Sequence, residues 1–172
     1  MKRIIFISAI VCLTSFVLGG QVMMVNTKSG VKNFSVSSID SITFTTVKDS
    51  VIFDNGNIGG VSGTNSPPAD STRFSISAAM VVTYLQDYHY YNGGHLPGTI
   101  SLKHSDGTVY GPFQTTGLVG QGNVPNAYWV CYPDVTIKAG GYTVIDSDPS
   151  TWSHNTESSD KGFARVQGYP AQ

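Results

Sequence analysis

The chain has 172 residues, of which only 12% are charged, and its formal net charge at neutral pH is −1. This length suits one domain with a buried core rather than two domains of ordinary size. No cluster of Lys and Arg follows the first three residues, which argues against a nucleic-acid partner and against attraction to an anionic membrane surface.

Residues 1–20 have the pattern of a secretory signal peptide. A positively charged start is followed by an apolar run from Ile4 to Leu18 and by the small residues Gly19-Gly20. The run is shorter than the roughly 20 residues that span a bilayer, so cleavage is favoured over a retained membrane anchor. We therefore expect a secreted protein, extracellular or at the cell surface, with no membrane span after the signal is removed.

The mature chain would carry no internal disulfide, although export leads to a compartment that permits one. Cys131 is the only cysteine left after cleavage, so an intramolecular disulfide is excluded. Its neighbours in NAYWVCYPDV predict a buried strand residue rather than a nucleophile, because no base or positive group accompanies it. Cys12 lies within the signal, and Val11 precedes it where a lipoprotein signal requires a small residue, which disfavours a lipid anchor.

Residues 21–48 predict a small strand unit. Two short strands flank a turn at 27–30, and a third follows in SITFTT. Because such a ribbon contains few apolar residues and is marginal alone in water, we expect it to pack against its own domain or against another copy of the chain. The residues expected to form the assembly strands are Val22, Met24, Val25, Phe34, Ile42 and Phe44.

Residues 49–172 predict an antiparallel β-sandwich. VIFDNG at 51–56 begins it as a strand, and the Gly-, Ser- and Pro-rich stretch at 56–70 follows as a surface loop. The clearest hairpin is GTISLKH-SDG-TVYGPF, with its turn at Asp106-Gly107. About seven or eight short strands separated by Gly and Pro indicate an all-β, jelly-roll-like sandwich, with a closed barrel as the alternative.

The stretch YTVIDSDPSTWSHN at 142–155 concentrates polar side chains at the end of a predicted strand. Pro149 ends the strand, and the serines and threonine after it can then bond to the backbone. The first interpretation is a corner stabilised by its own side chains and capped by Trp152. The second is a calcium site, because bent loops of this composition supply oxygen ligands. Its predicted ligands are Asp54, Asn55, Asp146, Asp148 and Asp160.

We do not expect an enzyme. Asp146, His154 and a neighbouring serine have the residue types of a hydrolytic triad, but residues so close in sequence usually serve their own loop. No Gly-x-Ser-x-Gly elbow is present. Asp146 and Asp148 at one strand end also offer no cleft for the carboxyl pair of a glycosidase. The four histidines lack the spacing of a zinc site.

Aromatic residues form the other candidate site. In YLQDYHYYNGG, strand alternation places Tyr84, Tyr88 and Tyr90 on one face and His89 with Tyr91 on the other. One set can join the core, and an exposed set could stack on sugar rings or contact another protein. The predicted platform consists of Tyr88, His89, Tyr90, Tyr91 and Trp152.

Several short motifs follow one another between Ile52 and Tyr169. They are Tyr88-His89, Asn92-Gly93, Pro97-Gly98-Thr99-Ile100, Val124-Pro125-Asn126, Tyr128-Trp129, and the run from Tyr142 through Asp146-Ser147-Asp148-Pro149 to Trp152-Ser153 and Asn155. In this order they resemble a small all-β module of secreted bacterial proteins. The resemblance implies a β-sandwich without an assigned reaction. Tyr90 departs from it, because the module has Trp there. SGVKNFSVSSIDSITF at 29–44 resembles a strand unit that follows the signal peptide in many secreted bacterial proteins.

These features predict a non-catalytic structural or adhesive protein. An exposed strand of one copy could complete the sheet edge of the next, and a head-to-tail contact of this kind generates a filament. We therefore expect a homo-oligomer or an extracellular fibre, with calcium as a potential stabilising ion. The alternative is a carbohydrate-binding module that holds polysaccharide on exposed Tyr and Trp side chains.

Overall fold

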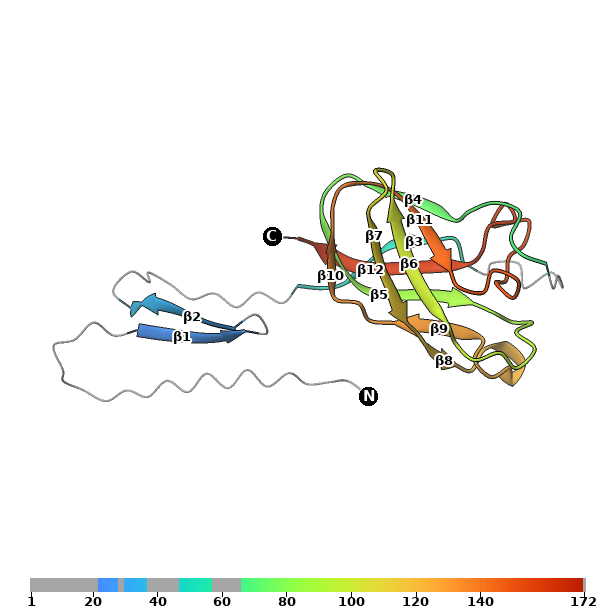
Figure 1. Ribbon diagram of the computed structural model, residues 1–172, viewed down its shortest axis with the longest axis horizontal. Helices are drawn as coiled ribbons and strands as arrows, with labels where there is room; N and C mark the ends of the chain where they lie inside the picture. The colour runs from blue at the N-terminus through green and yellow to red at the C-terminus, as the bar shows by residue number, and fades with distance from the viewer. Residues whose placement is uncertain (1–21, 28–29, 37–46, 57–65, 172) are drawn as a thin grey trace. The chain divides into compact units, whose positions relative to one another are not determined.

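The computed structural model describes residues 22–27, 30–36, 47–56 and 66–171 of the chain (Figure 1). The predicted signal peptide and the third strand of the N-terminal unit, with Ile42 and Phe44, lie outside the described residues. The chain divides into two compact units, Met1–Thr45 and Thr46–Gln172, beside the predicted boundary between residues 48 and 49.

The first unit contains an antiparallel hairpin. Its strands are β1 (Val22–Thr27) and β2 (Gly30–Ser35), paired from Val22↔Ser35 to Thr27↔Gly30. Gly30 has a φ of 119°, in the region that favours glycine, as expected for a residue that closes a tight turn. The predicted hairpin is therefore present with its turn between Thr27 and Gly30.

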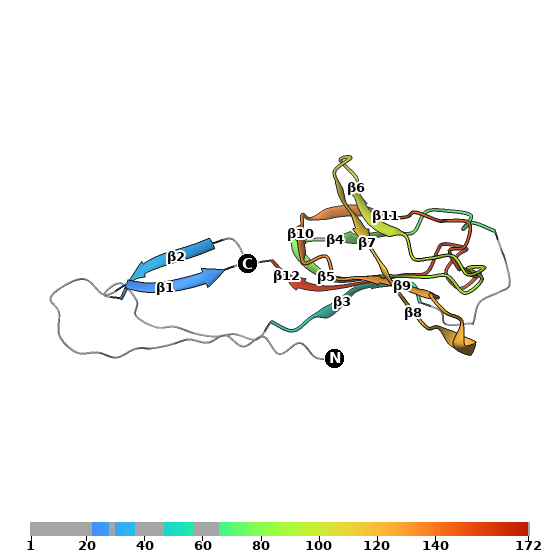
Figure 2. The ribbon, with the colours of Figure 1, turned by 60° about the horizontal axis from the view of Figure 1, so that its bottom comes forward.

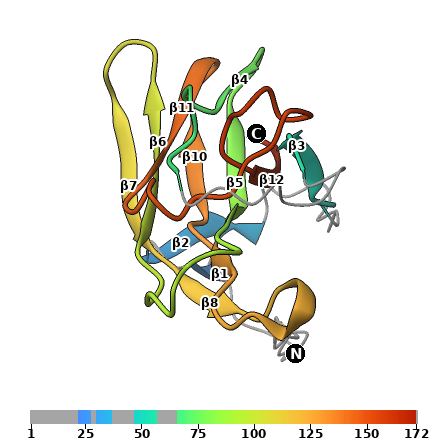
Figure 3. The same ribbon diagram turned by 90° about the vertical axis from the view of Figure 1, so that its right-hand side faces the viewer.

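The second unit is a β-sandwich, which confirms the predicted fold class. One sheet has the order β3-β12-β5-β9-β8, with β10 also paired to β5, and the other has the order β4-β11-β6-β7. Figures 2 and 3 show these sheets as two layers. The strands of the first sheet are β3 (Ser50–Asp54), β5 (Met80–Tyr88), β8 (Thr116–Leu118), β9 (Tyr128–Cys131), β10 (Val135–Ile137) and β12 (Ala164–Pro170). The strands of the second are β4 (Arg73–Ile76), β6 (Thr99–His104), β7 (Val109–Gln114) and β11 (Gly140–Asp146).

All pairings between these strands are antiparallel. The jelly-roll order of connections stays a prediction. The helical element of the second unit is the short η2 (Gln121–Asn123). Within the described residues, no helix has the length and apolar character needed to cross a membrane.

Alternation along the strands builds the core between the sheets. On β11, Tyr142, Val144 and Asp146 are buried, whereas the residues between them are more exposed. Near the end of β5, Leu85 and Asp87 are likewise buried on either side of the more exposed Gln86, and Tyr88 after them is buried as well. Most of these inward-facing positions are apolar, as on other half-buried strands. The last inward-facing residue is an aspartate in both strands, Asp87 on β5 and Asp146 on β11. The buried apolar cluster comprises Phe74, Val82, Leu85, Ile100, Leu102, Cys131, Ile137, Tyr142, Val144, Trp152, Ala164 and Val166.

Two connections between strands of the second unit differ in what they join. The hairpin of β6 and β7 is confirmed, with Gly107 donating its N–H to the His104 carbonyl at 2.9 Å. The connection that ends at Gly140 carries the chain from β10 in one sheet to β11 in the other. Gly140 is required there because its φ is 140° and a Cβ atom would lie 2.1 Å from His104 Nε2.

Candidate functional site

The corner that follows β11 is stabilised by its own side chains. Asp146 Oδ1 accepts a hydrogen bond of 2.6 Å from the backbone N–H of Asp148, and Asp148 Oδ2 accepts one of 3.0 Å from the Thr151 hydroxyl. Beyond Pro149, the Trp152 N–H donates to the Pro149 carbonyl at 3.3 Å. The bond from the Asp148 N–H to the Asp146 side chain is typical of an Asx turn, and the Thr151 hydroxyl and the Pro149 carbonyl add further local bonds, so the predicted corner is confirmed.

Trp152 joins this corner to the body of the sandwich. Its indole Nε1–H donates to the Phe163 carbonyl at 2.8 Å, and its ring lies so close to Gly162 that a Cβ there would be 2.2 Å from ring carbons. Ser153 extends the junction, because its N–H donates to the Tyr88 carbonyl at 2.8 Å and its carbonyl accepts from Phe163 at 2.9 Å. The corner is therefore fixed to the end of β5.

This junction places three titratable side chains together. Asp87, His89 and Asp146, here called the Asp–His–Asp cluster, are all buried, and their ligand-type atoms lie within 4.8 Å of one another. His89 Nε2 is 3.1 Å from Asp146 Oδ2. The Trp129 ring stacks on the His89 ring with centroids 3.7 Å apart, so one wall of the cluster is aromatic.

The cluster is anchored from outside by hydroxyl and backbone groups. His89 Nδ1 lies 2.9 Å from Thr151 Oγ1, and the Thr151 hydroxyl also reaches Asp148. Burial opposes ionisation of Asp148, but hydrogen bonds from Ser150, His95 and Thr151 outweigh it and hold the pKa of that carboxyl below its ordinary value.

Asp87 has the opposite electrostatic environment. Burial raises the pKa of its carboxyl well above the ordinary value, and the neighbouring Asp146 carboxylate raises it further. As an ionised acceptor, Asp87 has no hydrogen-bond donor within reach of either oxygen in the described part of the chain. A proton on Asp87 changes this, because the neutral carboxyl can donate to Asp146. Sequence reasoning missed Asp87, although its alternation with Leu85 already placed it on the buried face.

The predicted calcium ligands are not brought together. Asp54 faces Arg165 at 3.5 Å, and the Asn55 amide donates to the Gly162 carbonyl at 2.9 Å. Asp160 lies 3.6 Å from His154, while Asp146 belongs to the cluster and Asp148 to the turn. Each side chain therefore serves its own neighbourhood, because the residues lie on separate segments with local partners.

The residues whose types suggest a hydrolytic triad do not come together either. Asp146 faces His89 rather than His154, and His154 Nε2 lies 3.1 Å from the Ser66 carbonyl. The prediction that Cys131 is a buried strand residue is confirmed, and burial raises the pKa of its thiol to about 12.

The predicted aromatic platform needs correction. Tyr88, His89 and Trp152 are buried, so their rings cannot form an open stacking surface. Tyr88 is covered by Phe163 and Ala127, and the strand ends before Tyr90 and Tyr91, which pack edge to face at 4.9 Å. Strand alternation predicts the faces of side chains up to the end of β5 at Tyr88. It fails beyond that point, because the chain turns at Tyr90 and Tyr91.

An aromatic and polar cleft does exist on the outer face of the six-stranded sheet. It has a volume of about 230 Å³ and is called the outer-face cleft here. Cross-strand pairs Tyr88↔Tyr128 and Gln86↔Arg165 contribute neighbouring walls. Its lining residues are Asp54, Gly56, Gln86, Tyr88, Gln121, Tyr128, Phe163, Ala164 and Arg165. From the sequence, Asp54 is predicted only as a calcium ligand, and neither Tyr128 nor Arg165 belongs to the predicted aromatic platform.

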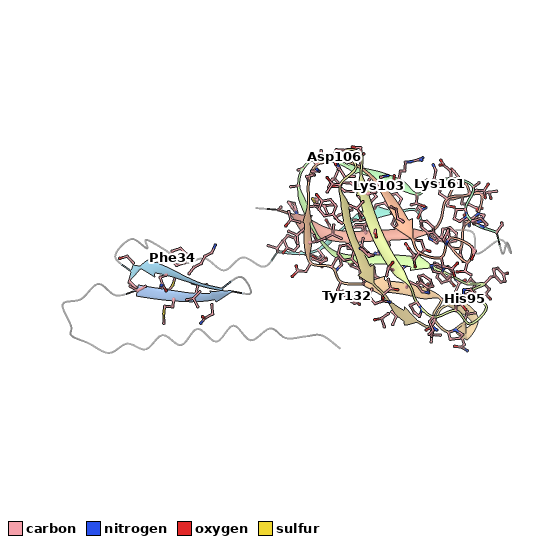
Figure 4. All side chains as sticks on the ribbon, in the orientation of Figure 1. Phe34, His95, Lys103, Asp106, Tyr132 and Lys161 are labelled. Carbon is pink, nitrogen blue, oxygen red and sulfur yellow. The ribbon has the colours of Figure 1, made fainter. Side chains whose placement is uncertain are left out.

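The assembly residues that are described lie on the hairpin. Met24 is 68% exposed and Val22 is 55% exposed, and Val25 and Phe34 are also exposed. Figure 4 labels Phe34 on β2. Ile42 and Phe44 lie outside the described residues.

Comparison of the chain with protein-family models, with curated proteins and with solved structures finds no match.

Proposed function

We propose that the protein is a non-catalytic secreted module that binds carbohydrate in the outer-face cleft. The observation that carries this proposal is the combination of a tyrosine wall with accessible polar groups on one sheet face. Tyr128 is partly exposed and lies against Tyr88 with ring centroids 4.6 Å apart, which holds its ring in place. Aromatic rings of this kind offer an apolar surface beside a polar hydroxyl.

Polar groups of three strands complete the cleft. Asp54 and Arg165 approach to 3.5 Å, and their side chains remain 34% and 39% exposed. A carboxylate accepts hydrogen bonds and a guanidinium donates them, so the pair matches the donor and acceptor hydroxyls of a sugar. Gln86 lies beside Arg165 and accepts a hydrogen bond of 2.6 Å from the Tyr84 hydroxyl, which orients its amide. A small number of polar groups that converge beside aromatic walls is typical of sites that bind small ligands.

Binding to a panel of soluble and insoluble polysaccharides tests this proposal. We expect retention of the mature chain on at least one glycan, and Tyr128→Ala or Arg165→Met should weaken it about tenfold or more, the effect of about 1.4 kcal/mol of lost binding free energy. Tyr132→Ala is the matched control, because Tyr132 is a 72% exposed tyrosine on the chain segment after β9 and does not line the cleft. No retention on any glycan, or equal losses in Tyr128→Ala and Tyr132→Ala, would refute the proposal.

A second candidate is self-assembly through the hairpin, and it rests on a different observation. The register places Val22, Met24 and Val31 on one face of the ribbon and Val25 with Phe34 on the other, and all five side chains are exposed. An isolated two-stranded ribbon is marginal in water, so burial of these side chains against a second copy would stabilise it. In this role the partner is another molecule of the same chain.

Sedimentation and electron microscopy of the mature chain test assembly. We expect concentration-dependent oligomers or filaments, which Met24→Lys should abolish. Asn33→Lys is the matched control, because Asn33 pairs with Met24 across the hairpin but is already polar. A monomer at high concentration, or equal effects of the two lysines, would exclude this role.

A further inference from the structure

The Asp–His–Asp cluster concentrates negative charge inside the protein. Asp87 and the side chain of Asp146 have no exposed surface, and the ion pair found for Asp146 in the described chain is with His89. Neither carboxylate has a Lys or Arg partner among the residues that the structure describes. Buried carboxylates require compensation by a proton, a cation or both.

Unsatisfied atoms lie at the same place. Both carboxylate oxygens of Asp87 and the indole Nε1–H of Trp129 are buried without a hydrogen-bond partner in the described chain. The two residues are direct cross-strand neighbours in the pairing of β5 with β9. Since each unsatisfied buried polar group is costly, their coincidence beside His89 indicates a site for something that the amino acids do not supply.

The surrounding hydrogen bonds orient the remaining ligand atoms. The Thr151 hydroxyl has a single proton, and the Asp148 carboxylate at 3.0 Å is its strongest acceptor. Thr151 Oγ1 then accepts from His89 Nδ1–H at 2.9 Å, which leaves the lone pair of Nε2 directed toward the two aspartates. One oxygen of Asp146 is held by the Asp148 N–H, so the other, which faces His89, is the one available to an ion. Such outer contacts are the ones that orient histidine and carboxylate ligands in metal sites.

We propose that Asp87, His89 and Asp146 bind one divalent transition-metal ion, with Zn²⁺ as the best match. Zn²⁺ accepts both imidazole nitrogen and carboxylate oxygen as ligands and needs only four in total, whereas Ca²⁺ prefers six to eight oxygen ligands. A water molecule would complete the coordination and could accept the Trp129 N–H.

The ion would act as a link between the two sheets. Asp87 lies at the end of β5 in one sheet with His89 just after that strand, and Asp146 lies at the end of β11 in the other sheet. All three ligands are buried, so the role is structural and independent of the outer-face cleft. Loss of the ion would leave like charges facing each other across the sandwich, which predicts a less stable apo-protein.

Metal loading of the mature chain tests the proposal. The protein is unfolded in denaturant with chelator, refolded without metal, and then refolded in parallel with Zn²⁺, Co²⁺ or Ca²⁺ so that the buried site can fill. We expect one bound Zn²⁺ or Co²⁺ per chain by elemental analysis, a visible absorption band for the Co²⁺ form, and a melting temperature raised by about 4 °C or more over the apo-protein. Ca²⁺ should give none of these effects.

Asp87→Asn should abolish stoichiometric binding and the Co²⁺ band. Asp106→Asn is the matched control, because Asp106 also faces a histidine, His104, at 2.7 Å but has no second carboxylate ligand beside it. Substoichiometric Zn²⁺ and Co²⁺ with an unchanged melting temperature would overturn the proposal and favour a shared proton in the cluster. Undiminished binding by Asp87→Asn would also overturn it. If Asp87→Asn does not fold, the stoichiometry and Co²⁺ spectrum of the wild-type protein still decide.

Discussion

His89 and His104 each face an aspartate, but they lie at opposite ends of the sandwich and in different surroundings. His89 meets the fully buried Asp146 at 3.1 Å, whereas His104 meets Asp106 at 2.7 Å at the tip of the β6–β7 hairpin, where the Asp106 side chain is 49% exposed. Figure 4 labels Asp106 at this tip and His95 near the other end of the same hairpin. The pairing of residue types is alike at both ends, so any difference in behaviour comes from the environment.

The aspartates show how large that difference is. Burial and the charge of Asp146 raise the pKa of Asp87, while hydrogen bonds from Lys138, Thr108 and His104 lower the pKa of Asp106. Asp106 is half exposed and pairs with Lys138, whereas Asp87 is fully buried and has no Lys or Arg partner among the described residues. The aspartate beside the histidine is therefore exposed and paired with a lysine at the hairpin tip, whereas at the corner it is buried with its negative charge uncompensated by a Lys or Arg of the described chain.

Removing the aromatic cap of the corner, Trp152, should cause the largest loss of stability. Trp152 is buried, packs on Gly162 and donates to the Phe163 carbonyl, so Trp152→Ala should lower the free energy of unfolding by about 3–5 kcal/mol. Val109→Ala at the hairpin tip is the control, because Val109 is exposed and its truncation should cost about 0.5 kcal/mol or less. Urea unfolding followed by circular dichroism measures both. Similar losses for the two variants would mean that the corner is not part of the cooperative core.

A pair of threonines gives a closer comparison of the two ends. Thr151→Val removes the hydroxyl between His89 and Asp148, leaving a buried imidazole nitrogen without its partner, and should cost about 1–3 kcal/mol. Thr108→Val removes the hydroxyl that accepts from Lys138 at 3.0 Å, but the exposed lysine can turn to water, so the cost should be about 0.5 kcal/mol or less. Both values come from the same urea titration. An equal cost at the two sites would show that burial does not separate the histidine environments.

The sequence predicts the scaffold better than the site because the scaffold depends on local patterns. Alternating apolar residues and the Asp106-Gly107 turn predict β6 and β7 directly, and Pro149 predicts the end of β11. The Asp–His–Asp cluster depends instead on a contact between Asp87 and Asp146, which are on different sheets and far apart in the chain. No local period reports such a contact.

The failed predictions have the same origin. Strand alternation gives the face of Tyr88, but it does not reveal that Phe163 and Ala127 cover that face. The calcium prediction groups its ligands only by their oxygen atoms. In the fold, Asp54 pairs instead with Arg165 on the neighbouring strand β12. The outer-face cleft could have been approached from the sequence only if the pairing of β5 with β12 and β9 had been known.

Removing the charge of Asp106 at the hairpin tip should cause the smallest loss of stability, and this loss should depend on pH. Lys138, Thr108 and His104 hold the pKa of Asp106 below the unfolded value of about 4, so the folded state favours the ionised form. The stabilisation is then fully present above about pH 4 and is lost as the pH falls below it, because the unfolded chain binds the proton more readily. Melting temperatures of wild type and Asp106→Asn should differ slightly at pH 7, and the difference should narrow as the pH falls below about 4. Added salt should also narrow it at pH 7, because the site is exposed. No gap at any pH would show that Asp106 stabilises the tip through a hydrogen-bond acceptor that Asn also provides, and not through its charge.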